Sequence, residues 1–269
     1  MTLPRFDRAD GETRTANPAA VTVDTVLDGR VSIRQPASGY RAAIDPVMLA
    51  AAVPARPGET VLDVGCGVGT AGLCLAARVP EVLVRGIDLQ RELIVLANAS
   101  AGDNGLTDRV EFLLGDLLHP PVHLAVGLFD HVMANPPFIA AGRGHRPSHR
   151  GKATAVVEGE ARFADWIRFC LRMVRPKGSV TVIHRADRLD EVLTAMAAGL
   201  GELVVFPLWP GLAPEPDGGS KPAKRVIVRG RKGLATPLRL MPGLILHTEE
   251  GLYTAAADRV LREGAALVL

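Results

Sequence analysis

The sequence predicts an α/β fold with a mostly parallel sheet and a small N-terminal β-hairpin. After Pro57-Gly58, short apolar runs alternate with longer segments of helical period, a pattern typical of repeated strand-helix-strand units. Upstream, the runs AVTVDTVL and RVSIRQ flank Asp28-Gly29, which predicts a hairpin with a two-residue turn. The core is therefore expected to begin near residue 56.

Strands are expected over the apolar runs 60–64, 82–87, 110–113, 130–134, 179–184, 202–208 and 225–229. Helices are expected over 70–79, 90–102, 159–174 and 188–200, with a short helix over 44–53 that ends before Pro54. Turn-forming residues over 212–222 predict a surface loop. The tail GLILHTEEGLYT indicates a second small hairpin, and Thr254 is the candidate N-cap of a last helix.

Composition excludes several classes of protein. Of 269 residues, 48% are hydrophobic and 22% charged, which excludes intrinsic disorder. No apolar stretch reaches the ~18 residues of a membrane span, and the first residues lack the apolar centre of a secretion signal, so a soluble cytoplasmic protein is expected. Cys66, Cys74 and Cys170 have no metal-ligand spacing, so neither disulfides nor a metal site is expected.

Basic residues are concentrated in two strips of the chain. The net charge is only +2, yet residues 143–152 hold four Lys or Arg without an acid, and residues 221–232 hold six without an acid. The rest of the chain is therefore acidic. Such a distribution suits a polyanionic partner such as RNA, although basic strips are also common as plain solvated surface.

A strand that ends in a glycine-rich turn forms the first candidate site. Residues 61–70 read VLDVGCGVGT and precede a helical segment, so the backbone at Gly65 and Gly67 can approach a ligand closely. The dinucleotide motif GxGxxG needs glycine where Thr70 stands, and Asp63 would repel a pyrophosphate. An ammonium or sulfonium group suits that carboxylate, which favours S-adenosylmethionine over NAD. A turn that binds nothing is the alternative.

Two further acids follow predicted strands. Asp88 ends the second core strand, where a carboxylate can accept hydrogen bonds from both hydroxyls of a ribose. Asp116 follows the third strand and is a candidate acceptor for an adenine amine, although an ordinary helix N-cap explains it nearly as well.

The tetrapeptide Asn135-Pro136-Pro137-Phe138 directly follows the predicted strand DHVMA. The prolines restrict the backbone and lack N–H groups, so the Pro136 carbonyl and the Asn135 side-chain oxygen are free to accept from an NH₂ group. Such acceptors would aim the lone pair of the nitrogen at an electrophile, and Phe138 could stack on a planar substrate. A proline-rich loop without chemistry is the alternative.

With these motifs the sequence resembles the class I S-adenosylmethionine-dependent methyltransferases of the NPP(Y/F) type. The segments QPxxGYRAAID (35–45), VRGRKG (228–233) and GLYT (251–254) further resemble bacterial valine-tRNA adenine N6-methyltransferases. The resemblance covers nearly all of the chain beyond residue 20. It implies the Rossmann-like seven-stranded class I methyltransferase fold. It also implies methylation of the N6 amine of an adenine in tRNA.

The resemblance also implies roles for individual residues. Asp63, Gly65 and Gly67 would line the methionine end of S-adenosylmethionine, Asp88 its ribose and Asp116 its adenine, while Asn135, Pro136 and Phe138 would hold the target base as catalytic residues. Arg41 and Asp45 lie in a segment that would fold over the cofactor pocket, with Arg41 the candidate partner of the methionine carboxylate. Residues 1–55 are accordingly interpreted as a cap on that pocket and residues 56–269 as the core. The chain has Val157 where relatives often have His.

The expected reaction is direct attack of the adenine amine on the methyl group, with RNA as partner, no metal and no covalent enzyme intermediate. Flipping the adenine out of its stack costs less in a single-stranded loop. Three alternatives stay open: a protein glutamine methyltransferase, a nicotinamide oxidoreductase, and an RNA-binding or cofactor-binding module without catalysis.

Overall fold

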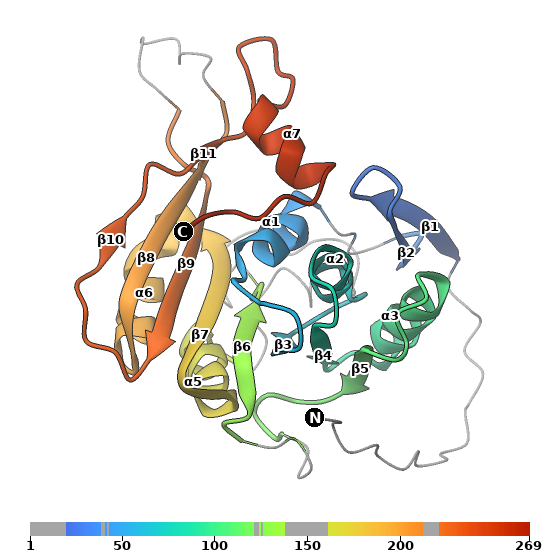
Figure 1. Cartoon of the computed structure of the whole chain (residues 1–269), viewed down its shortest axis with the longest axis horizontal. Coiled ribbons are helices and arrows are strands. Elements are labelled where there is room, and N and C mark those ends of the chain that lie inside the picture. Colours follow the sequence, from blue (N-terminus) through green and yellow to red (C-terminus); the bar gives the residue numbers. More distant parts are fainter. Residues whose placement is uncertain are drawn as a thin grey trace.

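Within the described residues, nine strands form one sheet that runs through the molecule (Figure 1). The computed structural model describes residues 20–38, 41, 43–120, 124, 126–137, 161–211 and 221–269. The strands are β3 (Thr60–Val64), β4 (Leu83–Asp88), β5 (Val110–Leu114), β6 (Phe129–Ala134), β7 (Val174–Arg185), β8 (Leu200–Trp209), β9 (Arg225–Lys232), β10 (Arg239–Leu240) and β11 (Leu244–Ile245). Their order is β10-β8-β9-β7-β6-β3-β4-β5, and β11 pairs with β8.

The seven longer strands confirm the Rossmann-like α/β fold that the sequence predicts. Strands β5, β4, β3, β6 and β7 run parallel to one another, whereas β9 is antiparallel to both of its neighbours, β7 and β8. The parallel strands are buried because helices cover both faces of the sheet. Their carboxyl ends therefore share one edge of the sheet, at which a ligand can reach several turns together.

Helices pack on both faces of the sheet (Figure 1). One face carries α1 (Ile44–Ala52), α2 (Thr70–Arg78), α3 (Arg91–Asp103) and α7 (Ala255–Leu261), and the other carries α5 (Phe163–Met173) and α6 (Leu189–Ala197), which follows the short 3-10 helix Ala186–Arg188. Each layer encloses its own cluster of buried apolar side chains, so the sheet separates two cores. No helix in the described part of the chain has the length and apolar character needed to cross a bilayer.

The N-terminal hairpin is present, and its turn lies at the predicted residues. Strands β1 (Val21–Val26) and β2 (Val31–Pro36) pair antiparallel, with Val26 opposite Val31. The N–H of Arg30 donates to the carbonyl of Leu27 at 3.2 Å, so Asp28 and Gly29 are the two central residues of the turn. Both have positive φ angles, as a two-residue hairpin turn of type I′ requires. Leu27, just before the turn, is buried in the core.

The tail forms the predicted second hairpin over part of its expected length. His247 makes an antiparallel bridge with Tyr253, the N–H of Thr248 donates to the carbonyl of Leu252 at 2.8 Å, and the N–H of Thr254 donates to the carbonyl of Leu246 at 2.9 Å. The apolar residues of β11, which come just before, instead run parallel to β8 and extend the sheet at that edge. The predicted cap is confirmed: Oγ1 of Thr254 accepts a hydrogen bond of 3.2 Å from the N–H of Ala257 at the start of α7.

Candidate active site

Three turns meet at the carboxyl edge of the parallel strands. In the sheet register, Val64 at the end of β3 lies opposite Ile87 in β4 and Ala134 in β6. The residues that follow or end these strands, including Asp88 and Asn135, therefore lie side by side although they are far apart in sequence. The residues predicted from separate motifs thus meet at a single site.

Backbone hydrogen bonds fix the glycine turn after β3. The N–H groups of Gly65 and Cys66 both donate to the carbonyl of Ile87, at 2.8 and 3.0 Å. Gly65 and Gly67 have φ angles of +69° and +56°, in the left-handed region that favours glycine. The turn therefore wraps the end of β4 and leads directly into the first turn of α2.

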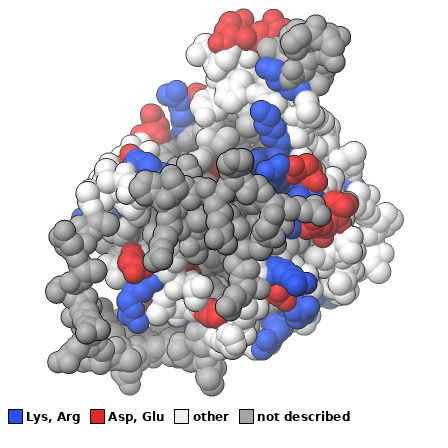
Figure 2. Space-filling view, turned by 180° about the vertical axis from the view of Figure 1, so that it is seen from behind, with Lys and Arg blue, Asp and Glu red and all other residues white. Residues whose placement is uncertain are grey.

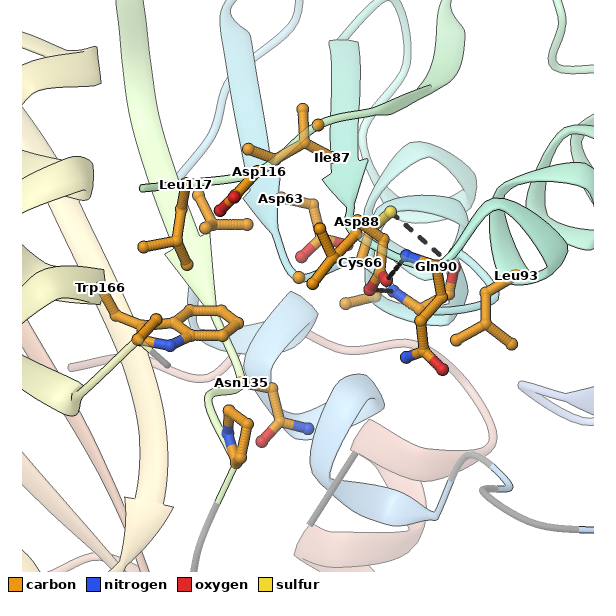
Figure 3. A pocket seen from close by; sticks show the side chains of 18 of the residues that line it. Asp63, Cys66, Ile87, Asp88, Gln90, Leu93, Asp116, Leu117, Asn135 and Trp166 are labelled. Carbon is orange, nitrogen blue, oxygen red and sulfur yellow. Dashed lines mark hydrogen bonds between the residues drawn. The ribbon is translucent and has the colours of Figure 1, made fainter. Parts of the chain in front are cut away.

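A cavity of about 520 Å³ opens at this edge (Figure 3). Its lining comes from β3 and the glycine turn, from the end of β4 and start of α3, from the turn after β5, from the turn after β6, and from α5. Of the predicted site residues it includes Asp63, Gly65, Gly67, Asp88, Asp116 and Asn135, together with Pro137. A space of this size accommodates a ligand as large as a nucleoside cofactor.

Asp63 is a buried carboxylate, only 2% exposed, beneath the glycine turn. Its Oδ2 accepts a hydrogen bond of 3.2 Å from the N–H of Gly72 in α2. Burial raises the pKa of Asp63 to about 7; the bond from Gly72 opposes this rise and the nearby Asp88 adds to it. A cationic ligand group in the cavity would therefore favour the ionised form of this side chain.

Asp88 connects two turns through its carboxylate. Oδ2 accepts from the N–H of Gly67 at 2.9 Å, and Oδ1 accepts from the N–H of Gln90 at 2.8 Å (Figure 3). Burial raises the pKa of Asp88, and the hydrogen bonds from Gln90 and Gly67 offset part of that rise. Each oxygen retains a further acceptor site, so the side chain can still accept from a ligand.

Asp116 lies where the cavity meets solvent, in the turn after β5. Oδ1 accepts from the N–H of Leu118 at 2.8 Å, and Oδ2 lies 3.0 Å from Nδ1 of His119. Partial burial acts to raise the pKa of Asp116, but hydrogen bonds from His119 and Leu118 outweigh it, so the pKa lies below its ordinary value. The bond to the N–H two residues ahead belongs to a turn and not to the helix N-cap considered from the sequence, because residues 117–120 form no helix. The place of Asp116 in the cavity wall is compatible with the ligand role.

Asn135 presents an unpaired acceptor at the cavity wall. Its Oδ1 is buried and has no hydrogen-bond partner among the described residues. Pro137 lines the same cavity, Pro136 is buried and is not part of the described cavity wall, and Phe138 lies outside the described residues. A buried carbonyl oxygen without a donor is costly, so this atom is set up to receive an N–H group from a ligand.

Arg41 and Asp45 are outside the described cavity wall. Nη2 of Arg41 pairs with Asp24 of the hairpin at 2.6 Å, and Asp45 at the start of α1 pairs with Arg225 at 2.8 Å. Pro46, the next residue of α1, does line the cavity. The structure thus brings the first turn of α1 to the site, while the role of Arg41 towards a methionine carboxylate stays a prediction.

Trp166 in α5 is a cavity residue that the sequence analysis missed. Its indole ring lines the cavity beside Asn135 and Leu117 (Figure 3). In sequence it lies three residues after Phe163, on the same face of an amphipathic helix, where an aromatic residue is most often part of the core. The sequence therefore carries no signal that distinguishes it from a core residue.

The basic strip 221–232 does not form one surface. At the start of β9, Arg225 pairs with Asp45 at the cavity edge, whereas at the opposite edge Arg231 pairs with Glu202 at 3.3 Å and Lys232 donates to two backbone carbonyls. The strip follows β9 from one edge of the sheet to the other, so it does not present the one continuous basic surface to a polyanionic partner that its charge in the sequence suggested. On the face seen in Figure 2, described basic and acidic side chains are interspersed. The strip 143–152 lies outside the described residues.

All three cysteines are buried. Burial raises the pKa of the Cys66 thiol well above its ordinary value, with the Asp63 and Asp88 carboxylates adding to the rise, and it raises the pKa of Cys74 and of Cys170 to about 12. Cys66 lines the cavity, but its thiol is not activated as a nucleophile.

Comparisons with known proteins agree with this geometry. The family model for the methyltransferase small domain matches residues 43–150. The chain is 29% identical over 169 residues to a Porphyromonas gingivalis protein named tRNA1(Val) (adenine(37)-N6)-methyltransferase, covering 61% of this chain and 66% of that one. It is 29% identical over 136 residues to the rRNA N(6)-adenosine-methyltransferase metl-5 of Caenorhabditis elegans, covering 51% and 56%. The chain thus spans less than two thirds of the length of these relatives.

A solved structure described as a predicted O-methyltransferase, protein Atu636 from Agrobacterium tumefaciens, superposes with a TM-score of 0.66. It is 25% identical, and the superposition covers 83% of this chain and 98% of that one. The sheet order, the glycine turn between Asp63 and α2, and these relatives agree with one another. The chain has a class I methyltransferase fold, contains a methyltransferase small domain over residues 43–150, and resembles the tRNA1(Val) adenine N6-methyltransferases.

Proposed function

We propose that the protein transfers a methyl group from S-adenosylmethionine to the N6 amine of an adenine in RNA, with a tRNA as substrate. The observation that carries this proposal is the unpaired, buried Oδ1 of Asn135 in the wall of the same cavity as Asp63 and Asp88. An amide or an aromatic amine supplies the N–H group that this acceptor lacks. The relatives named for adenine N6 methylation favour the aromatic amine.

The cavity residues fit the proposed cofactor. Asp63 offers a buried carboxylate to the cationic methionine end, and Asp88 offers its remaining acceptor sites to two ribose hydroxyls. Asp116 lies in the turn after β5, where its carboxylate can accept from an adenine amine. Gly65 and Gly67 of the glycine turn are part of the same cavity wall, so their backbone borders the space for the ligand. When bound, S-adenosylmethionine supplies an electrophilic methyl group on a sulfonium.

Asn135 and Pro136 orient the acceptor. The two N–H bonds of the amine donate to Oδ1 of Asn135 and to the carbonyl of Pro136, which turns the nitrogen lone pair towards the methyl carbon. The nitrogen so oriented would take the methyl group that S-adenosylmethionine supplies, the electron pair of the C–S bond leaving with sulfur, and would then lose one proton to water. The two carbonyl acceptors stabilise the positive charge that develops on the nitrogen, so a strong base is not required.

Methyl-labelled S-adenosylmethionine tests this proposal. The protein is incubated with separate pools of tRNA, rRNA and protein, and each labelled pool is digested to nucleosides or amino acids. Label in N6-methyladenosine from tRNA is the expected result. Label in methylglutamine would establish the alternative acceptor, and cofactor binding without any transfer would establish a module without catalysis.

A further inference from the structure

The indole of Trp166 reaches the cavity from the helix layer on the far side of β6. Helix α5 packs its apolar face, with Phe163 and Ile167, against the sheet, and both side chains are buried. Trp166 lies at the border of that face and is half-buried, so its ring extends past the end of the sheet into the cavity wall. The N–H of Arg162 donates to Asp165 at 3.0 Å, which fixes the first turn of the helix that carries the ring.

The glycine turn is shaped to receive this ring. A Cβ atom on Gly65 would stand 2.6 Å from Cζ3 of Trp166, closer than real Cβ atoms come to any neighbour. Gly65 therefore has two independent reasons to be glycine: its φ of +69° and the indole against it. The indole ring packs directly against the glycine turn, so the contact with Gly65 fixes the position of the Trp166 side chain.

Trp166 belongs to the Asn135 end of the cavity. In Figure 3 its ring lies next to Asn135, with Leu117 beside it, while Gln90 and Leu93 line the opposite end near Asp88. The proposed cofactor contacts include Asp88 at that opposite end and Asp63 between the two. The flat apolar surface of the indole is thus beside the acceptor that orients the amine.

From this placement we infer that Trp166 is the wall on which the acceptor base stacks, and that it selects a planar base over a small amide. This inference rests on the proposed function. A base turned out of an RNA loop loses its stacking neighbours, and an indole replaces them. An amide side chain has no aromatic face, so it gains far less from the same wall. Trp166 would act by positioning the base, while Asn135 contacts the reacting nitrogen.

Three variants test the inference: Trp166→Ala removes the wall, Trp166→Phe keeps an aromatic surface, and Trp209→Phe is the matched control. Trp209 donates from Nε1 to the carbonyl of Pro242 at 2.9 Å and is not part of the cavity wall. We expect Trp166→Ala to lower kcat/KM for RNA about 10- to 100-fold, as the loss of one stacking contact predicts. Trp166→Phe should recover most of this loss, and Trp209→Phe should behave as the wild type.

Affinity for S-adenosylhomocysteine, measured by calorimetry, separates the base from the cofactor. We expect the Trp166→Ala variant to bind it within about threefold of wild type, which also shows that the variant is folded. A tenfold or greater loss of that affinity would assign the wall to the cofactor and overturn the inference. Unchanged kcat/KM in Trp166→Ala would overturn it as well.

A fluorescent base gives a readout that does not depend on turnover. With 2-aminopurine at the methylated position of the RNA, stacking on the indole should quench fluorescence on binding to wild type, and Trp166→Ala should show brighter emission. Equal emission in both would contradict stacking. If wild type transfers no methyl group to RNA, the proposed function fails in the wild type itself, before any variant is compared.

Discussion

The carboxylate of Asp88, at the end of β4, accepts a hydrogen bond of 2.9 Å from the N–H of Gly67, which lies in the turn after the neighbouring strand β3. Both groups are buried, so the bond is shielded from water. The same carboxylate is the proposed acceptor for the ribose of the cofactor. One side chain therefore contributes to the fold of the turn and to ligand binding.

Replacing Asp88 with Ala should affect both properties. The free energy of unfolding without ligand should fall by about 1–3 kcal/mol, because the buried N–H of Gly67 loses its acceptor. Affinity for S-adenosylmethionine should fall as well, and NAD should not compete. Denaturant unfolding and titration calorimetry measure the two effects. Asp103→Ala, which removes a solvent-exposed pair with Arg34, is the control and should change stability far less than Asp88→Ala. Equal cofactor affinity in wild type and Asp88→Ala would contradict the assignment.

Replacing Asn135 with Ala should separate binding from chemistry. Cofactor affinity should stay within a few-fold of wild type, while single-turnover methylation should slow by roughly a hundredfold or more, because the amine loses one of its two orienting acceptors. Rapid-quench measurements with the labelled RNA give the rate. A near-normal rate in this variant would show that Asn135 does not orient the amine, even with methyl transfer established.

Asp63 should make ligand-free stability depend on pH. Burial raises its pKa in the folded state to about 7, above its ordinary value near 4, so the folded protein holds a proton that the unfolded chain has lost. The free energy of unfolding should therefore fall as pH rises from about 4 to about 7 and then level off, as far as this group contributes. Asp63→Asn should remove that part of the decline, as urea unfolding across this pH range would show.

The same carboxylate should release its proton when the cationic cofactor binds. Calorimetry in buffers of different ionisation enthalpy should detect close to one proton released at pH 6 and little at pH 8.5. Asp63→Asn should abolish the difference between buffers. The assignment would fail if the variant released the same amount of proton as wild type.

RNA binding should depend on salt through residues of the first basic strip. We expect Arg146→Ala to lower the slope of log affinity against log salt by about one, without changing base preference. Lys232→Ala is the matched control, because this lysine donates to the backbone carbonyls of Leu171 and Val174. It should leave the slope unchanged and lower stability instead. A flat response to salt in wild type would indicate a partner other than RNA.

Periodicity and turn residues predicted the strands and helices of the core, because each of these elements buries an apolar face or run that is visible in sequence. They did not predict that β7 follows α5 directly at Val174, since residues 175–178 read as a polar turn. The turn of the first hairpin was predictable, because Asp28 and Gly29 tolerate the positive φ angles that it requires. The burial of Leu27 was not, because only the packed structure contains that contact.

Site residues were predictable from the sequence where a short motif at the end of a strand contained a polar side chain suited to the ligand. Asp63, Asp88 and Asn135 each follow or end a strand, and the parallel topology brings them together. Trp166 was not predictable, because its role depends on a contact with Gly65 across about a hundred residues of chain. The pairing of Arg225 with Asp45 likewise required the antiparallel direction of β9.

Because all three native cysteines are buried, thiol labelling of the folded protein should give a low background signal. Cys74 and Cys170 are packed in the core, Cys66 is buried at the cavity wall, and all three keep their protons at neutral pH, so maleimide probes should react slowly with them in the folded state. A cysteine introduced at the exposed Lys224 would then be the single fast-reacting thiol. A probe there, where β9 begins at the cavity edge, would report the arrival of an RNA without any alteration of the native cysteines.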